Sequence, residues 1–337
     1  MHVKDQIVTA DYAIYNSDCM EVLPTIPDNS VGLSVYSPPF AGLYQYSSSD
    51  RDFSNCESRE QFLTQYEFLV AEIARVTKPG RITAVHCTDV FDNSCNLWDF
   101  PHEIIAIHAR HGFQYRCRQL VRKEPLKVRM RTMVKSLMHK CVIEDMTQCF
   151  SAMPDYVLIF TKKGESEDPV RHDLGLTEFP YFGEQPVLPA FLQAWNNDEN
   201  NPHVETCDQL WDFLTTTYEG HTDPYTNRLS MYTWRRYADA FWDDIRIDNV
   251  LPYRDSKEED DEKHVHPLQL DVIDRIVYMY SNTGDTVLTP FMGVGSEVYS
   301  PVSMGRKAIG IELKDSYFKQ AKINLELAAG RFSTVKP

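Results

Sequence analysis

The sequence predicts an α/β protein in which a mixed β-sheet carries helices on both faces. Three segments support this prediction. An apolar run, Val31–Tyr36, has the length and composition of a buried strand. A second apolar strand begins at Asp285 and leads through a glycine turn into a helix start at Ser296. A third strand, Lys307–Glu312, ends in an acid about 20 residues after Gly293, the spacing of a Rossmann-like unit.

The first strand leads directly into Ser37, Pro38, Pro39 and Phe40. Two consecutive prolines fix two φ angles and remove two N–H donors, so nearby carbonyls are held without competing donors. A serine hydroxyl, a fixed carbonyl and an aromatic face can hold a planar group that carries an –NH₂, such as a nucleobase. Alone, these four residues are more typical of a proline-stiffened loop, so the interpretation depends on the rest of the chain.

The C-terminal glycine turn predicts a nucleoside site. Gly293 and Gly295 let the backbone approach a ligand closely, and Ser296 can cap the following helix. Backbone N–H groups and a positive helix end can hold a carboxylate or a phosphate. Glu312, at the end of the next strand, can accept hydrogen bonds from both ribose hydroxyls. The chain has no complete G-x-G-x-x-G, which favours one nucleoside over a dinucleotide.

Together these segments resemble a β-group DNA amino-methyltransferase, which uses S-adenosylmethionine to methylate cytosine N4 or adenine N6. Segments 16–30, 75–80, 82–86, 154–161 and 266–269 also match this family in order and spacing, and the resemblance covers residues 12–164 and 264–327. It implies a seven-stranded Rossmann-like sheet with the circularly permuted methyltransferase order, in which the catalytic half comes first. A small accessory or target-recognition region would complete the fold.

The resemblance also implies roles for individual residues. Ser37, Pro38, Pro39 and Phe40 would be catalytic, with Phe40 stacked on a base rotated out of the duplex. The cofactor would lie across the carboxyl ends of the central strands, with its adenine near Asp18 and its ribose on the acid of the last strand. The residues expected to bind it are Asp18, Cys19, His266, Gln269, Pro290, Phe291, Gly293, Gly295, Ser296, Glu312 and Leu313.

Two positions depart from the family pattern. Thr289 stands where the family usually has an aspartate, which removes a carboxylate near the methionine end of the cofactor. We expect lower affinity rather than a different function, because the threonine hydroxyl can still form a hydrogen bond. Pro301 falls inside the helix after Ser296, where proline should produce a kink.

The net charge of −15 is unusual for a DNA-binding protein, but its distribution is uneven. Residues 165–262 have a net charge of −16, which leaves +1 for the rest of the chain. Residues 116–140 hold nine Lys/Arg and one acid, Glu124. Because potentials are screened within about 8–10 Å, a basic segment can bind phosphate while the acidic segment faces away.

The basic segment therefore predicts phosphate contacts, with one or two arginines reaching guanine edges, although an ordinary solvated surface is the alternative. The long aromatic loop at 41–53 is interpreted as a lid over the flipped nucleotide, or else as a surface loop packed by its tyrosines. The residues expected to contact DNA are Tyr44, Arg116, Arg118, Arg122, Lys123, Arg129, Arg131, His139 and Lys140.

Other classes of protein are disfavoured. No run reaches the ~18 apolar residues of a membrane span, and the N-terminus lacks a signal-peptide core. The eight cysteines are scattered, which favours reduced thiols in a cytoplasmic protein. The family resemblance implies a bacterial, archaeal or phage origin. His102, His108 and His111 share one expected helix, but no nearby cysteine or acid completes a closed metal site, and we expect no metal.

Three parts follow from these observations. Residues 1–164 form the catalytic half, with a DNA-contact segment at 113–140; residues 165–262 form an acidic target-recognition or association region; and residues 263–337 form the cofactor half. The predicted substrate is double-stranded DNA. Ser37, the first of the four residues 37–40, resembles the cytosine-N4 enzymes of the family, which favours cytosine N4 over adenine N6 as the target. An RNA methyltransferase and an inactive DNA-binding module are the competing functions. A restriction endonuclease is a candidate partner of the monomer or homodimer.

Overall fold

The computed structural model describes residues 3–39, 52–91, 97–132, 135–177, 186–216, 223–256 and 267–332. Three residues predicted to belong to the site, Phe40, Tyr44 and His266, lie outside these ranges. Most of the loop at 41–53 also lies outside them. Within the described ranges, no helix has the length and apolar character needed to cross a membrane.

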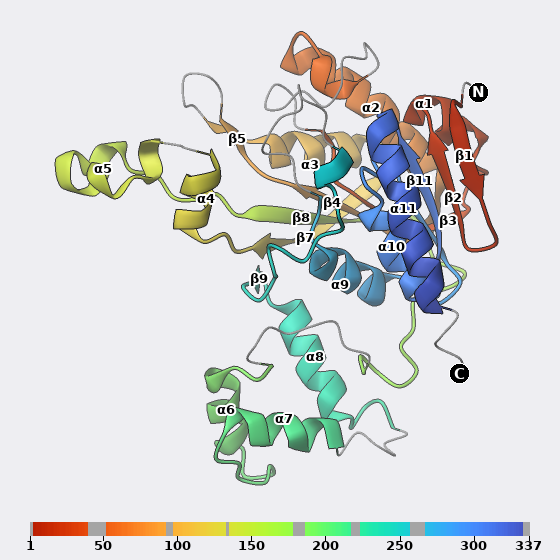
Figure 1. The fold of residues 1–337 in the computed structure, drawn as a ribbon. Helices are drawn as coiled ribbons and strands as arrows, with labels where there is room; N and C mark the ends of the chain where they lie inside the picture. The colour runs from red at the N-terminus through yellow and green to blue at the C-terminus, as the bar shows by residue number, and fades with distance from the viewer. Residues whose placement is uncertain are drawn as a thin grey trace.

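The body of the molecule is a mixed sheet in the order β1-β2-β11-β10-β3-β4-β8-β7-β9 (Figure 1). Strands β2, β11, β10, β3 and β4 are parallel, and β8 runs antiparallel between β4 and β7. The strands are β1 Asp5–Val8, β2 Tyr12–Asn16, β3 Val31–Tyr36, β4 Thr77–Cys87, β7 Phe113–Val121, β8 Asp155–Lys162, β9 Phe241–Trp242, β10 Thr286–Thr289 and β11 Lys307–Glu312.

The prediction of seven strands is wrong, because the described residues form nine in this sheet. The two additional strands lie at its edges. β1 forms a hairpin with β2 and is mostly exposed, and β9 has only two residues, which pair with the end of β7. Neither strand has a continuous apolar pattern, so hydrophobic periodicity does not reveal them. Within segment 75–80, which matched the family, the chain passes from helix to strand: α2 ends at Val76 and β4 begins at Thr77.

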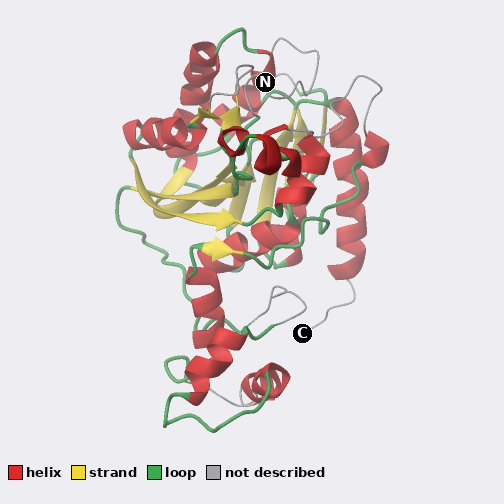
Figure 2. Cartoon of the chain, turned by 90° about the vertical axis from the view of Figure 1, so that its left-hand side faces the viewer, coloured by secondary structure: helices red, strands yellow, loops and turns green. Residues whose placement is uncertain are grey.

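Helices cover both faces of the sheet (Figure 2). Leu288 on β10 belongs to the same buried cluster as α2 and α3, whereas its neighbour Val287 packs with α9. Consecutive strand residues point to opposite faces, so these helices lie on different sides. α10 and α11 pack with Ala308, the register partner of Val287, and share the face of α9. These helices are α2 Arg59–Val76, α3 Phe100–Arg110, α9 Leu270–Tyr280, α10 Ser296–Ser303 and α11 Asp315–Phe332.

The strand order brings together two segments from opposite ends of the chain. β3 pairs in parallel with β10, with Leu33 opposite Val287 and Ser34 opposite Leu288. The connections from these two strands lead to opposite sides of the sheet order, which makes their junction a topological switch point. Crevices at such points, outside the carboxyl ends of the strands, are where α/β proteins bind ligands.

Arg81 fixes this junction from the side opposite to the crevice. Its side chain is 1% exposed and forms an ion pair with Asp285, at the start of β10. Nε donates to the Gly32 carbonyl at 3.1 Å, and Nη1 donates to the Asp168 carbonyl at 2.7 Å. A Cβ on Gly32 would lie 2.8 Å from the Asp285 carboxyl carbon, so this position favours glycine. β3, β4 and β10 are therefore held together by one buried guanidinium.

Two parts project from the sheet (Figure 1). The chain between β7 and β8, residues 122–154, extends outward, and we call it the arm. Below the sheet, α6, α7 and α8 enclose their own apolar cluster, which includes Trp195, Leu210 and Tyr232.

The remaining elements of the described chain are shorter. They are α1 Cys19–Val22, η1 Leu23–Thr25, η2 Phe53–Asn55, β5 Val90–Phe91, β6 Leu97–Trp98, α4 Pro125–Thr132, η3 Lys135–Leu137, α5 His139–Glu144, η4 Met146–Gln148, α6 Pro189–Asn196, α7 Cys207–Thr216, α8 Arg228–Ala238 and η5 Arg254–Ser256.

Two of the three histidines of the α3 region, His108 and His111, have separate surroundings. His108 is fully buried, hydrogen bonds the Ile104 carbonyl at 2.8 Å and stacks on Phe160. Burial lowers its pKa to about 3, so the ring is neutral. His111 instead lies 3.2 Å from the Glu67 carboxylate. His108 thus has the contacts of a core residue.

Candidate active site

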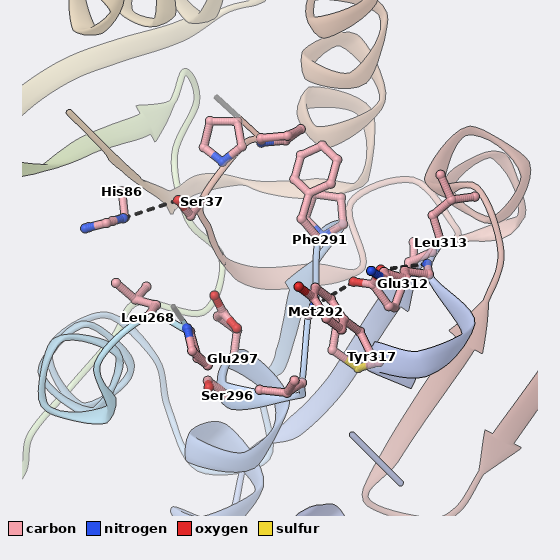
Figure 3. A pocket seen from close by; sticks show the side chains of 18 of the residues that line it. Ser37, His86, Leu268, Phe291, Met292, Ser296, Glu297, Glu312, Leu313 and Tyr317 are labelled. Carbon is pink, nitrogen blue, oxygen red and sulfur yellow. Dashed lines mark hydrogen bonds between the residues drawn. The ribbon is translucent and has the colours of Figure 1, made fainter. Parts of the chain in front are cut away.

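A pocket opens where the chain leaves β3 and β10 (Figure 3). Ser37, Pro38 and Pro39 line it from the first half of the chain. Pro290 and Gly293 line it from the second half. The two most informative segments of the sequence therefore share one cavity, as the switch point requires. Phe40 lies outside the described residues, so its stacking role stays a prediction.

Ser37 is in contact with a histidine from the neighbouring strand. Tyr36 is the register partner of Val85, so the next residues along the two strands, Ser37 and His86, emerge side by side. The Ser37 Oγ lies 3.2 Å from Nδ1 of His86 (Figure 3). On the other side of the ring, Nε2 lies 3.3 Å from Oδ2 of Asp155, close enough for an ion pair but off the line of a good hydrogen bond.

Asp155 keeps its charge although it is buried. Burial by itself would raise its pKa, but the charge of Lys123 and the contact with His86 outweigh burial and hold the pKa well below its usual range. The ionised carboxylate favours a proton on Nε2 of His86. In the neutral ring Nδ1 is then the acceptor, and the Ser37 hydroxyl donates to it. Ser37 itself lines the pocket.

The glycine turn is organised around Glu312. The backbone N–H of Gly293 donates to Oε2 at 2.8 Å, and that of Lys314 donates to Oε1 at 2.7 Å. Desolvation nevertheless raises the Glu312 pKa to about 7. Gly293 and Gly295 have φ values of 55° and 97°, which a larger residue would adopt only with strain. With this backbone conformation the turn presents the Gly293 N–H to Glu312.

Ser296 does not cap α10. Gly295 is the N-cap residue and Ser296 is the first residue of the helix. The Ser296 Oγ is buried at the pocket and has no hydrogen-bond partner among the described residues. The Thr289 Oγ1 is also buried without a partner in the part of the chain that the structure describes, and Thr289 does not line the pocket. α10 continues through Pro301 to Ser303.

Comparison with known proteins assigns the family. The family model described as DNA methylase matches residues 31–323, which is most of the chain. The chain belongs to this DNA methylase family. The type II methyltransferase M1.MboII of Moraxella bovis is 22% identical over 317 residues, 93% of this chain and 95% of that protein. The DNA adenine methyltransferase YhdJ of Escherichia coli K12 is 38% identical over 147 residues, 43% of this chain and 45% of that protein.

Solved structures share the fold of this DNA methylase. TTHA0409 from Thermus thermophilus, solved with S-adenosyl-L-methionine, superposes with a TM-score of 0.58 at 19% identity and covers 97% of this chain and 98% of its own. The PvuII DNA methyltransferase, named cytosine-N4-specific, gives a TM-score of 0.57 at 14% identity, with 98% and 95% covered. At these identities the similarity shows the fold alone.

Most residues that we expected at the cofactor line the methylase pocket. They are Asp18, Cys19, Gln269, Pro290, Phe291, Gly293, Ser296, Glu312 and Leu313. The carboxylate of Asp18 also caps α1, accepting from the Met20 N–H at 2.9 Å. Gly295 does not line the pocket but caps α10. These contacts place the residues in one cavity, while their roles stay proposals.

The described residues that we expected to contact DNA lie on β7, on the arm or in the pocket. Arg116 and Arg118 are exposed on β7, where the Arg118 guanidinium lies 5.5 Å from the Tyr156 ring. Arg129 and Arg131 are on α4. Lys123 lies in the pocket and pairs with Asp155, which differs from its expected place on the DNA-facing surface. Exposed positions on the arm are Arg122, His139 and Lys140.

Sequence reasoning missed His86 and Asp155 in the pocket. His86 is near the carboxyl end of β4, and Asp155 is the first residue of the antiparallel β8, so both lie at the same edge of the sheet as Ser37. A strand-end position was therefore the only local signal for either residue. Glu297, another buried acid of the pocket, was also missed because it follows the glycine turn as an ordinary helix residue.

Proposed function

We propose that this DNA methylase transfers a methyl group from S-adenosylmethionine to the exocyclic amine of a base rotated out of double-stranded DNA, with cytosine N4 as the preferred target. One observation carries the proposal: Ser37, Pro38 and Pro39 share a pocket with the glycine turn and Glu312. The family membership supports the reaction and the cofactor.

The pocket has the polar groups that such a cofactor needs. Glu312 would accept hydrogen bonds from the ribose hydroxyls, and Asp18 would meet the adenine amine. Ser296 Oγ and Gln269 Oε1 are buried atoms without partners among the described residues, and both would be available to the methionine end. Buried polar atoms without partners are costly unless a ligand satisfies them. When bound, the cofactor supplies an electrophilic methyl group.

Ser37 would then hold the target amine. Because its own proton is donated to His86, Ser37 can accept a hydrogen bond from the –NH₂, and the Pro38 carbonyl can accept the other. These contacts draw the nitrogen toward a tetrahedral form and direct its lone pair. Positioning of this kind supplies up to about 7–11 kcal/mol in favourable cases. After transfer, the surplus amine proton can pass through Ser37 Oγ to His86 Nδ1, where Asp155 stabilises the resulting imidazolium.

The arm is suited to hold the duplex near this pocket. Its first residues and the strand that follows it bring Lys123 and Asp155 into the pocket wall, so the arm emerges from the pocket rim. Exposed basic groups such as Arg122 and Lys140 can position phosphates there. DNA bound along the arm would therefore lie next to the cavity that receives the flipped base.

Replacing Arg122 and Lys140 together by glutamine should weaken duplex binding and reduce the salt dependence of the affinity, by about one unit of slope for each phosphate that the variant no longer neutralises. Fluorescence anisotropy over a range of salt concentrations measures both. The control Lys319→Gln changes an exposed lysine on α11 and should leave binding unaltered. Single-stranded and duplex RNA serve as competitors. Equal slopes for the two variants, or stronger binding of RNA, would count against the DNA-binding arm.

Cytosine N4 is the preferred target because a serine precedes the two prolines, which resembles the cytosine-N4 enzymes. Adenine N6 is the second candidate, favoured by the identity of 38% to a relative named a DNA adenine methyltransferase. Mass spectrometry of nucleosides from DNA treated with the enzyme and cofactor should show N4-methylcytosine. N6-methyladenine as the sole product rejects the cytosine target, and intact DNA binding without any methylated nucleoside indicates an inactive module.

A further inference from the structure

Glu297 is a buried acid of the pocket to which the site described above gives no role. It lies in the first turn of α10, is 5% exposed, and its carboxyl group points into the pocket (Figure 3). No Lys, Arg or His within the described ranges forms an ion pair with it. The protein thus keeps a carboxyl group inside a ligand-sized cavity without a cation to balance it.

The surroundings of Glu297 favour its neutral form in the absence of ligand. Burial and, to a lesser extent, the nearby Glu312 raise its pKa to about 8. On the neighbouring helix α9, Asp274 faces α10 at Ser300 and is a further acid. Asp52 is another acid of the pocket lining. Of the two lysines in that lining, Lys123 pairs with Asp155, and the Lys314 ammonium lies 4.8 Å from the Tyr317 ring centroid. A buried acid without a partner is expensive, and such groups gather at functional sites.

The raised pKa of Glu297 predicts the direction in which the stability of the ligand-free protein changes with pH. A folded-state pKa above the unfolded value means that the fold loses stability as the pH rises through about 8, because the buried carboxyl must ionise. Glu297→Gln should therefore raise the melting temperature relative to the native protein at pH 9 but not at pH 5. This result would identify Glu297 as a group retained at a cost in stability.

Thr289 cannot supply the carboxylate that this end of the pocket lacks. Its side chain is completely buried, does not line the pocket, and has no hydrogen-bond partner among the described residues. Thr289 precedes the glycine turn in the chain, whereas Glu297 follows it and does line the pocket. S-adenosylmethionine carries an ammonium group on its methionine end, which requires an anionic or carbonyl partner when it is buried.

On the basis of the proposed function, we propose that Glu297 binds the α-ammonium group of S-adenosylmethionine and replaces the carboxylate missing at Thr289. The cation would form a charge-assisted hydrogen bond with Glu297. Because the acid is neutral beforehand, binding releases its proton to solvent: a carboxylic acid and an ammonium ion become a carboxylate–ammonium pair and one free proton. Cofactor binding at neutral pH is then coupled to proton release.

Two ligands isolate this interaction. S-adenosylhomocysteine retains the ammonium group but has no sulfonium charge, and 5′-methylthioadenosine retains the adenosine but lacks the amino acid end. Isothermal titration at pH 7 in buffers of different ionisation enthalpy counts the protons released by each. S-adenosylhomocysteine should release about one proton more than methylthioadenosine. Any proton released from Glu312 by the ribose contributes to both ligands and cancels in the difference.

Glu297→Gln should abolish this difference and lower the affinity for S-adenosylhomocysteine by about 10- to 100-fold, with methylthioadenosine affinity changed less than about twofold. Asp274→Asn is the matched control, because it removes another acid of raised pKa beside α10 that does not line the pocket. It should leave the proton difference intact. Circular dichroism verifies that both variants are folded.

Three results would overturn the inference. One is an equal proton count for the two ligands with the native protein, a measurement that needs no variant. Another is an equal loss of affinity for both ligands in Glu297→Gln, which would assign this residue to the nucleoside or to the fold. If the native protein binds neither ligand, the proposed function itself fails, and the role of Glu297 fails with it.

Discussion

Ser37→Ala should lower kcat by about 10²- to 10³-fold, the usual effect of removing one well-placed hydrogen-bonding group from an active site. The affinity for S-adenosylhomocysteine should remain nearly unchanged. The reason is geometric: Ser37 follows β3 and contacts His86 rather than the glycine turn. Single-turnover methylation of duplex DNA gives the rate, and calorimetry gives the affinity.

A control within the same pocket separates this role from the mere loss of a hydroxyl. Thr88 lines the pocket, but its hydroxyl donates to the Pro154 carbonyl at 2.9 Å. Thr88→Val should therefore change kcat only a few-fold, within the range of one ordinary hydrogen bond of about 1 kcal/mol. A collapse of cofactor affinity in Ser37→Ala would contradict the role assigned to Ser37.

The contact between Ser37 and His86 can be tested by a double-mutant cycle. His86→Ala should reduce kcat in the native background but have little further effect when Ser37 is already alanine, because residues that act as a unit are strongly non-additive. Additive losses would show that His86 acts independently of Ser37.

Arg81→Met should destabilise the fold by about 3–5 kcal/mol, which is the typical cost of removing one partner from a buried ion pair. The change leaves the Asp285 carboxylate buried without its cation, and it removes the donors to the carbonyls of Gly32 and Asp168. Urea unfolding followed by circular dichroism measures the free energy of unfolding.

The matched control is Arg110→Met, the same substitution in an exposed pair. Arg110 pairs with Glu67 at 2.9 Å, with side-chain exposures of 53% and 37%. Pairs of this kind contribute about 0–1 kcal/mol. Replacing both Arg81 and Asp285 by apolar residues should recover part of the stability that Arg81→Met removes. Equal losses for Arg81→Met and Arg110→Met would show that burial does not govern the Arg81 pair.

Local sequence patterns were sufficient for the central elements. β3 and β11 have the predicted bounds, because each is a short apolar run followed by residues that interrupt it. The glycine turn was recognisable from Gly293 and Gly295 between a strand and a helix start, and both glycines adopt positive φ values. Ser37 and Glu312 could be predicted at the site, since each immediately follows or ends such a strand.

Strand order could not be predicted in the same way at the edges of the sheet. β1 was not predicted because four mostly exposed residues have no periodicity of their own. Ser296 was predicted as a cap from its residue type, but the αL conformation of Gly295 made the glycine the N-cap. These differences arise because tertiary contacts decide between local alternatives of similar energy.

The amino-acid sequence alone determined which two segments line the pocket, since prolines and glycines fix the backbone conformation within a few residues and an acid marks the end of the last strand. The tertiary structure decided what surrounds them. His86 contacts Ser37 because β4 pairs with β3. Asp155 contacts His86 because β8 pairs with β4, and Lys123, which follows β7, pairs with Asp155. Glu297 faces the cavity because α10 starts at the glycine turn. Such contacts join residues far apart in the chain, so they depend on how strands pair in space, which no local pattern encodes.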